Sequence, residues 1–160
     1  MASNRQVPKH IRMDERNHVE KPFLDQLAGL GWTVIDLTDE KQKPSDTGRE
    51  SFTEVVMPGS LRQQLKVINP WMEDDQVEEV VKQLTASFPS TSLLENNRHL
   101  FQLLLENTSV SENRRTGEKS PTVRFVDFAQ RDNNSFVAVC QFKIRILGTE
   151  HHIIPDIVLF

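Results

Sequence analysis

The chain has 160 residues, of which 37% are hydrophobic and 26% are charged. This length suffices for one domain with a hydrophobic core, and no apolar run approaches the roughly 18 residues of a membrane span, so no membrane partner is expected. The formal net charge is −4, so DNA binding cannot be argued from an overall basic surface.

The start of the chain lacks the apolar core of a signal peptide. Cys140 is the only cysteine, which excludes an intrachain disulfide; its apolar neighbours predict a packed core thiol, and the chain is expected to be cytoplasmic.

The first part of the chain predicts a leader, a helix, a strand and a loop. Residues 1–13 are polar and predict a flexible leader. A helix is expected from near Lys21 to about Gly29, because apolar residues recur there at helical spacing and glycine favours a helix end. The β-rich run Trp32–Leu37 predicts a strand, and the polar residues 38–51 predict a loop.

Three further helices are expected between residues 58 and 106. Pro58 opens the first, which ends at Asn69, and the second begins at about Glu73. Acidic residues at the start of the second helix suit the positive end of the helix dipole, and its apolar residues recur at helical spacing. The third helix is expected from about Ser90 to Glu106. The apolar positions expected in these last two helices are Val77, Val80, Val81, Leu84, Leu93, Leu94, Leu100, Phe101, Leu104 and Leu105.

The last third of the chain favours strands. Val123–Ala129, Phe136–Leu147 and Ile153–Phe160 are rich in β-formers and are separated by short turn sequences. Short connections predict that these three strands form an antiparallel meander. With the helices before them, they predict an α+β fold.

Asp156 is the most unusual residue of this region. Side-chain alternation puts it on one strand face with apolar neighbours, and burying a carboxylate without a partner costs several kcal/mol. A salt bridge, a hydrogen bond at the end of a strand, or a metal ion would offset that cost. From periodicity alone the structural explanations are favoured, although Pro155 before it indicates an opening in the sheet.

The chain ends in the apolar segment 153–160. Natural termini tend to be polar and loosely ordered, so we expect Phe160 to lie inside a longer protein. The alternative is a terminal strand that is inserted in a sheet.

Several segments in order resemble the start of the R (restriction) subunit of type I restriction–modification enzymes. Pro155-Asp156-Ile157-Val158-Leu159-Phe160 resembles the first half of the PD-(D/E)xK nuclease motif, and the stretch from Asp132-Asn133-Asn134-Ser135-Phe136 to Gln141-Phe142 resembles the strand before it. Leu30-Gly31-Trp32 is similar to the end of the family's opening helix. Val67-Ile68-Asn69-Pro70 and Asn96-Asn97-Arg98 resemble its inserted helical region.

The resemblance implies an incomplete PD-(D/E)xK nuclease domain over residues 14–160, with a helical insertion at about 58–106. By position, Asp156 matches the family's metal-binding Asp, and Glu20 matches an acidic residue on the opening helix. The implied cofactor is Mg²⁺. The family's Glu and Lys would follow Phe160, so we expect this chain alone to bind Mg²⁺ weakly and to cut DNA poorly. Implied partners are double-stranded DNA and the methyltransferase and specificity subunits, with ATP used by a motor region outside this chain.

Several candidate residues, and the chain as a whole, also have alternative interpretations. Glu20 near a helix start is commonly only a dipole partner. Arg114 and Arg115 are candidate DNA contacts or part of a solvated loop, and Lys143 and Arg145 share a strand face that could meet DNA or pair with carboxylates. A competing function is a non-catalytic interaction module, which docks a partner subunit or the motor domain through the acidic helix 73–84. A third is a stand-alone protein of nuclease fold that has lost its catalytic residues.

Overall fold

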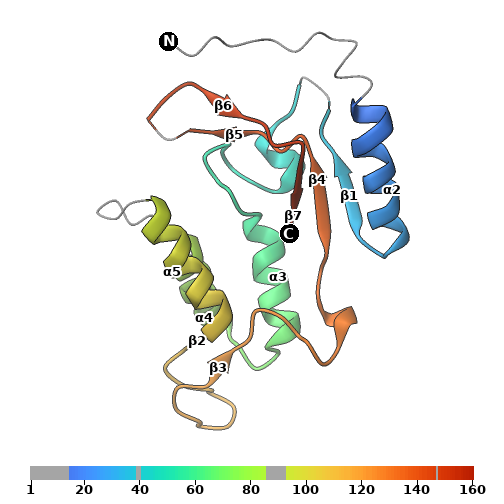
Figure 1. The fold of residues 1–160 in the computed structure, drawn as a ribbon. Coiled ribbons are helices and arrows are strands. Elements are labelled where there is room, and N and C mark those ends of the chain that lie inside the picture. Colours follow the sequence, from blue (N-terminus) through green and yellow to red (C-terminus); the bar gives the residue numbers. More distant parts are fainter. Residues whose placement is uncertain (1–14, 39–40, 86–92, 147) are drawn as a thin grey trace. The chain divides into compact units, whose positions relative to one another are not determined.

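The computed structural model describes residues 15–38, 41–85, 93–146 and 148–160 (Figure 1). The predicted leader, 1–13, lies outside these residues. The chain divides into two compact units. The first, here called the sheet unit, comprises the chain up to Asp46 together with Ser135–Phe160. The second, the helical unit, is Thr47–Asn134. A short 3-10 turn, η2 (Pro44–Thr47), lies at the boundary in the segment predicted as a loop.

The sheet unit begins with a π-helical turn, η1 (Arg16–Glu20), which continues into the helix α2 (Lys21–Gly29). Pro22 stands in the first turn of α2, where its missing N–H leaves no bond unmade, and α2 starts at Lys21 as predicted. At its end, Gly31 has a φ of 89°. This left-handed backbone lets the Trp32 N–H bond the Leu27 carbonyl at 3.1 Å, the usual way to close a helix.

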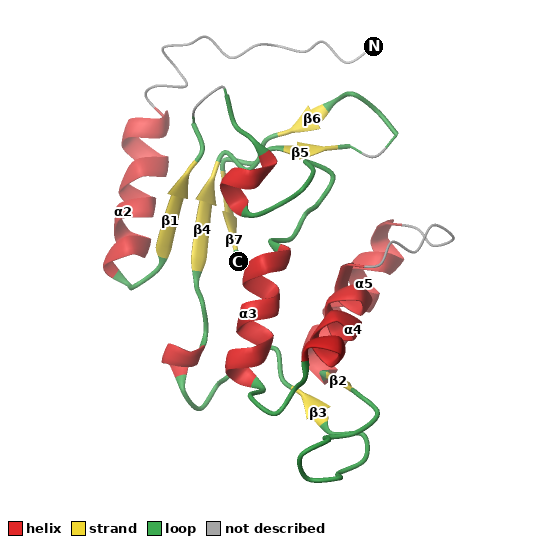
Figure 2. Cartoon of the chain, turned by 180° about the vertical axis from the view of Figure 1, so that it is seen from behind, coloured by secondary structure: helices red, strands yellow, loops and turns green. Residues whose placement is uncertain are grey.

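Three strands form the sheet, in the order β1-β4-β7. The strand β1 (Thr33–Asp36) pairs in parallel with β4 (Val137–Cys140), and β4 pairs antiparallel with β7 (Ile157–Leu159). Figure 2 shows the three strands side by side. Two short strands, β5 (Ile144–Arg145) and β6 (His152–Ile153), make a separate antiparallel hairpin.

The helix α2 covers one face of this sheet. Leu24 and Leu27 of α2 are buried against Ala138 and Cys140 of β4. Partly buried hydrophobic residues complete the cluster: Trp32, Val34 and Ile157. The expectation that Cys140 is a packed core thiol is confirmed, since it is buried and free.

The mixed α+β content is as predicted. The antiparallel pairing predicted between the last two segments is confirmed, because β4 pairs with β7 and β5 pairs with β6, but a meander of three continuous strands is wrong. The middle segment is two strands, because Gln141 has a left-handed φ of 60° that ends β4. The last segment is also two strands, and they separate at Ile154–Asp156, beside a proline that has no N–H for a ladder. The parallel partner of β4 is β1, which lies about 100 residues earlier in the sequence. The assignment to the PD-(D/E)xK fold stays a prediction.

The first predicted strand of that meander, Val123–Ala129, is also mostly absent. Only Thr122–Val123 is extended, as β3, and it pairs with β2 (Thr108–Ser109) in the helical unit. After it, Asp127 accepts hydrogen bonds from the N–H groups of Ala129 and Gln130, both at 3.0 Å. These bonds form a turn that precedes the 3-10 helix η3 (Arg131–Asn133). Local capping of this kind competes with strand formation.

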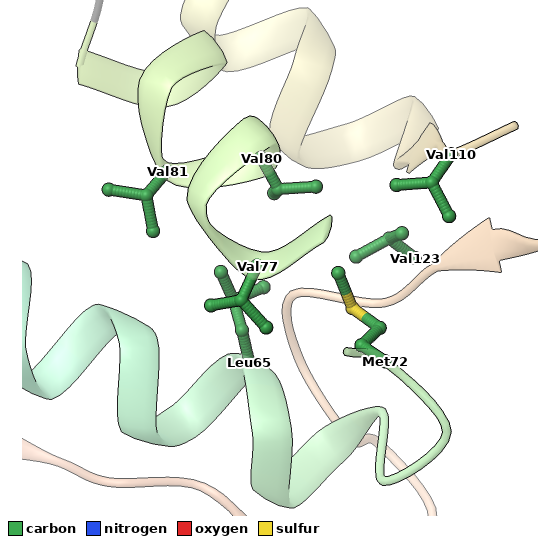
Figure 3. Close-up of a cluster of buried hydrophobic side chains, with 7 residues drawn as sticks. All are labelled: Leu65, Met72, Val77, Val80, Val81, Val110 and Val123. Atoms are coloured by element: carbon green, nitrogen blue, oxygen red, sulfur yellow. The ribbon is translucent and has the colours of Figure 1, made fainter. Parts of the chain in front are cut away.

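The helices of the helical unit are α3 (Pro58–Ile68), α4 (Asp74–Thr85) and α5 (Leu93–Glu106). The positions predicted for α3 and α4 are confirmed, and the proposed start of α5 at Ser90 lies outside the described residues. An aliphatic core joins α3, α4, β3 and the residue that follows β2 (Figure 3). Its members are Leu65, Met72, Val77, Val80, Val81, Val110 and Val123. On α5, by contrast, Phe101, Leu104 and Leu105 are more than half exposed.

No described helix has both the length and the apolar character that crossing a membrane requires.

Candidate functional site

Polar side chains meet at one edge of the β1-β4-β7 sheet. Asp36 ends β1 and pairs in register with Cys140, which ends β4, and Cys140 pairs with Ile157 at the start of β7. Because β1 and β4 are parallel and β7 runs the other way, the residues just beyond these positions lie at the same end of the sheet. This polar edge consists of Glu20, Asp36, Cys140, Gln141 and Asp156.

Asp156 lies outside any strand, immediately before β7, and its side chain is exposed. The expectation that it sits among apolar neighbours in the middle of a strand is wrong. It follows the gap between β6 and β7, so its carboxylate carries no burial cost. Two hydrogen bonds from Gln141 hold it: the backbone N–H donates to the Asp156 carbonyl at 2.8 Å, and the side-chain amide donates to Oδ1 at 3.3 Å.

Glu20 reaches the same edge from the last residue of η1. It is half-buried, and its Oε2 accepts a hydrogen bond from the Cys140 thiol with a sulfur–oxygen distance of 3.7 Å. Burial of Leu24 and Leu27, one and two turns further along, fixes the helix that carries it. Glu20 and Asp156 are thus brought to neighbouring residues of the chain, Cys140 and Gln141, although they lie 136 positions apart in the sequence (156 − 20).

Asp36 belongs to the polar edge and Arg16 is its ion-pair partner; neither was predicted as a site residue. Arg16 Nη2 and Asp36 Oδ2 form an ion pair at 2.6 Å, and Arg16 Nη1 lies 4.0 Å from the Cys140 sulfur. Burial pushes the pKa of Asp36 up, but hydrogen bonds from Thr38 and the charge of Arg16 outweigh it, so the pKa lies below its usual value. An Asp at the end of a strand-like run, with a Thr two residues later, was the available signal.

The Cys140 thiol remains protonated in these surroundings. Burial raises its pKa to about 11, and the negative charges of Asp36 and Glu20 add to the effect. A protonated thiol is a weak hydrogen-bond donor and a poor nucleophile. Cys140 therefore serves as a donor to Glu20 and as packing for α2.

A pocket of about 280 Å³ lies between α2 with its preceding turn and β1. Glu20 and Asp36 supply negative charge to its wall, and Arg16 and Lys21 supply positive charge. Within the ranges that the structure describes, no group of three His, Cys, Asp or Glu residues is arranged to hold a metal ion. The polar edge thus brings carboxylates together, but they do not form a metal site of three such ligands among the described residues.

The four basic residues considered for DNA binding lie in two places. In the helical unit, Arg114 makes a bidentate ion pair with Asp75, at 2.9 and 2.5 Å, and Arg115 lies 4.0 Å from Glu73. In the sheet unit, Lys143 and Arg145 are half-buried, and Arg145 pairs in register with His152. The charges of Arg114 and Arg115 are therefore balanced within their own unit.

The structure thus defines an α+β protein with a small mixed sheet, a helix over one face of that sheet and a polar edge. Comparison with known proteins gives the family. The family model described as "Type I restriction enzyme R protein N terminus" matches residues 12–160. The chain belongs to this family: it is the N-terminal region of a type I restriction enzyme endonuclease subunit.

Two curated relatives agree with this membership. The chain is 32% identical over 148 residues to the type I restriction enzyme HindI endonuclease subunit of Haemophilus influenzae, covering 92% of this chain and 14% of that protein. It is 22% identical over 153 residues to the putative type I restriction enzyme MjaIXP endonuclease subunit of Methanocaldococcus jannaschii, covering 93% and 14%. The chain therefore spans about one seventh of the length of these relatives. No solved structure matches it significantly.

Proposed function

We propose that this chain supplies the N-terminal part of a nuclease domain of the PD-(D/E)xK type. In the full protein, that domain would hydrolyse unmodified foreign DNA with Mg²⁺, while a motor region that uses ATP moves the DNA. Family membership supports the class of activity. The observation that carries the residue assignment is the exposed Asp156 carboxylate, which Gln141 holds at the polar edge.

The chemistry of Asp156 suits magnesium. Mg²⁺ prefers hard oxygen ligands, keeps several waters, and is commonly bound through only one or two carboxylates. The side-chain donor on Asp156 is the neutral amide of Gln141, so the negative charge of the carboxylate is not balanced by this contact. When bound, Mg²⁺ stabilises charge on the phosphate and lowers the pKa of a bound water.

Glu20 is the second proposed ligand. Its only described hydrogen bond is a weak one from a thiol, which costs little to exchange for a cation or for a water bound to it. We infer that the 160-residue chain alone would bind Mg²⁺ weakly and cleave DNA poorly, because the resemblance that assigns Asp156 and Glu20 also implies a second strand carboxylate and a lysine for the same site.

The proposed partners follow from the family. They are double-stranded DNA and the methyltransferase and specificity subunits of the same enzyme. Among the basic residues, Lys143 and Arg145 remain the better candidates for a phosphate contact, because they belong to the unit that carries Asp156. Arg114 and Arg115 would first have to leave their carboxylate partners.

The alternative, an interaction module that docks a partner through acidic α4, has less support. Each of four acidic residues on or next to this helix already lies beside a basic side chain of the same unit. These ion pairs are Arg62–Glu78, Lys66–Asp74, Arg114–Asp75 and Arg115–Glu73. A basic partner would therefore compete with existing pairs for little net gain.

The test is cleavage of an unmodified plasmid by the full-length subunit assembled with its partner subunits. We expect Asp156→Ala to lower magnesium-dependent cleavage by roughly 100-fold or more, since the loss of a metal ligand removes charge stabilisation in the transition state. Glu20→Gln should have a smaller effect. ATP hydrolysis should be unchanged in both variants, because the motor lies elsewhere.

Asp132→Ala is the matched control, because Asp132 is an exposed Asp in the helical unit. It should cleave as the parent does. Cleavage by Asp156→Ala at the parent rate would exclude Asp156 as a metal ligand.

A further inference from the structure

Gln141 has an unusual backbone for its residue type. Its φ of 60° lies in the left-handed region, which glycine adopts freely and other residues adopt at a cost in energy. Two other residues besides glycine are described there, Asn107 and Ser120. Asn107 directly follows α5, where a left-handed Asn is a common helix end. Ser120 lies in the charged 111–120 loop. Gln141 closes no helix, so its conformation needs another explanation.

The left-handed turn points two donors of Gln141 at one residue. Its backbone N–H bonds the Asp156 carbonyl at 2.8 Å, and its side-chain amide bonds Asp156 Oδ1 at 3.3 Å. A glycine would permit the same turn at lower cost and would keep the first bond but not the second. The turn by itself does not require a glutamine side chain. What the side chain adds is the hydrogen bond to the Asp156 carboxylate.

The other side of the turn is also held. The Gln141 carbonyl accepts a hydrogen bond from the side-chain amide of Gln42 at 3.0 Å, and the same amide bonds the Leu37 carbonyl just after β1. The conformation of Gln141 is thus fixed from the β1 side and from the β7 side. Backbone strain that the surrounding structure maintains is a feature of functional sites.

We propose that Gln141 is a positioning residue for the Asp156 carboxylate in metal binding, an inference that rests on the proposed function. The amide fixes the plane of the carboxylate by bonding one oxygen, and the other oxygen remains for the cation. Because the amide is neutral, it orients the carboxylate and leaves its negative charge in place. An arginine or lysine at this position would neutralise that charge. Residues that orient a metal ligand in this way commonly change metal affinity by about 10- to 100-fold when removed.

Two variants of the full-length subunit in its complex separate the side chain from the turn. Gln141→Ala removes the amide but keeps the strained backbone, whereas Gln141→Gly removes the amide and relieves the strain. We expect both to need about 10-fold more Mg²⁺ for half-maximal cleavage, with the rate at saturating Mg²⁺ much closer to that of the parent. Gln141→Gly should be at least as stable to heat as Gln141→Ala, so that a common metal phenotype cannot come from unfolding.

Metal binding gives a readout that is independent of cleavage. Titration with Mn²⁺ in the absence of nucleotide, followed by water-proton relaxation, should show the same weakening of about 10-fold for both variants. Gln102→Ala is the matched control, because Gln102 is an exposed glutamine on α5, and it should titrate as the parent does.

The outcomes separate this inference from the proposed function. Parent-like metal dependence in both Gln141 variants, together with loss of cleavage in Asp156→Ala, would overturn only the role of Gln141. Cleavage that survives Asp156→Ala would overturn both. A cleavage defect in the Gln141 variants that saturating Mg²⁺ does not reduce, with unchanged Mn²⁺ affinity, would also count against a positioning role.

Discussion

The two units of the chain differ in how far apart in sequence their interacting residues lie. The aliphatic core of the helical unit is drawn from one stretch, Leu65 to Val123. The polar edge of the sheet unit joins residues such as Glu20 and Cys140, which are 120 positions apart. Local contacts form at a lower entropic cost than distant ones. The helical unit therefore has a core that its own segment supplies, whereas the candidate site exists only when the long-range sheet is paired.

Each unit carries its own fluorescent reporter, which allows this comparison to be tested. The sequence has two tryptophans. Trp32 packs against the cluster under α2 in the sheet unit, and Trp71 packs against the aliphatic core of the helical unit. A Trp71→Phe background keeps Trp32 and would report urea unfolding of the sheet unit. A Trp32→Phe background keeps Trp71 and would report urea unfolding of the helical unit.

The largest expected effect is in the helical core. Leu65 is 2% exposed in the centre of that cluster, and Leu65→Ala should lower the free energy of unfolding seen by Trp71 by about 3 kcal/mol, because it leaves a cavity. Leu105→Ala, at a leucine that is 65% exposed, is the control and should change it by less than about 0.5 kcal/mol. If the Trp32 signal shifts equally with Leu65→Ala, the two units unfold as one.

A smaller effect is expected at Asn69, which is 1% exposed. Its side chain bonds both the N–H and the carbonyl of Arg124, at 2.9 and 2.8 Å, and so ties the end of α3 to the segment after β3. Asn69→Ala should cost about 2 kcal/mol, since it removes two hydrogen bonds made by a buried side chain. Urea unfolding with Trp71 measures this loss. Asn97→Ala, at an exposed position on α5, should leave the midpoint unchanged, and an equal loss there would contradict the assignment.

The smallest effect is expected at the ion pair of the sheet unit. Arg16→Ala removes the partner of Asp36, and both side chains are partly exposed, at 32% and 47%. The loss at pH 7 should therefore be only about 0.5 kcal/mol by the Trp32 signal.

The contribution of the Arg16–Asp36 ion pair to stability should depend on pH in a defined direction. The pKa of Asp36 is lowered in the folded chain relative to its ordinary 3.8, so its contribution to stability is present above pH 3.8 and is lost as the pH falls through the folded pKa. The difference between the parent and Arg16→Ala should shrink as the pH is lowered from 7 to about 3. A difference that grows toward low pH would show that Arg16 acts through packing rather than through Asp36.

The elements that the sequence predicted best are those with local signals. The starts of α2, α3 and α4 follow from Pro22, Pro58 and the acidic residues before Gln76, and the end of α2 follows from Gly31. Helix periodicity also identified the buried residues Val77, Val80 and Val81. Periodicity alone did not show that the apolar residues of α5 are exposed, because amphipathic spacing does not reveal whether a partner covers the face.

The sheet was predicted less well because strand pairing is a long-range property. Alternation predicted extended segments at Phe136–Leu147 and Ile153–Phe160, but it could not show that a left-handed Gln141 and the gap around Pro155 divide them. Nor could it show that β1 is the parallel partner of β4.

By itself, the sequence determined the helices, which depend on residue types and short spacings. It also determined the family, through several segments in a fixed order, and the resemblance to that family made Asp156 the candidate ligand. Only the tertiary structure decided where Asp156 lies and what holds it. Pairing of β4 with both β1 and β7 brings Asp36, Gln141 and Asp156 to one edge. There Gln141 donates two hydrogen bonds to Asp156. That arrangement follows from backbone pairing across more than 100 residues, which no local pattern encodes.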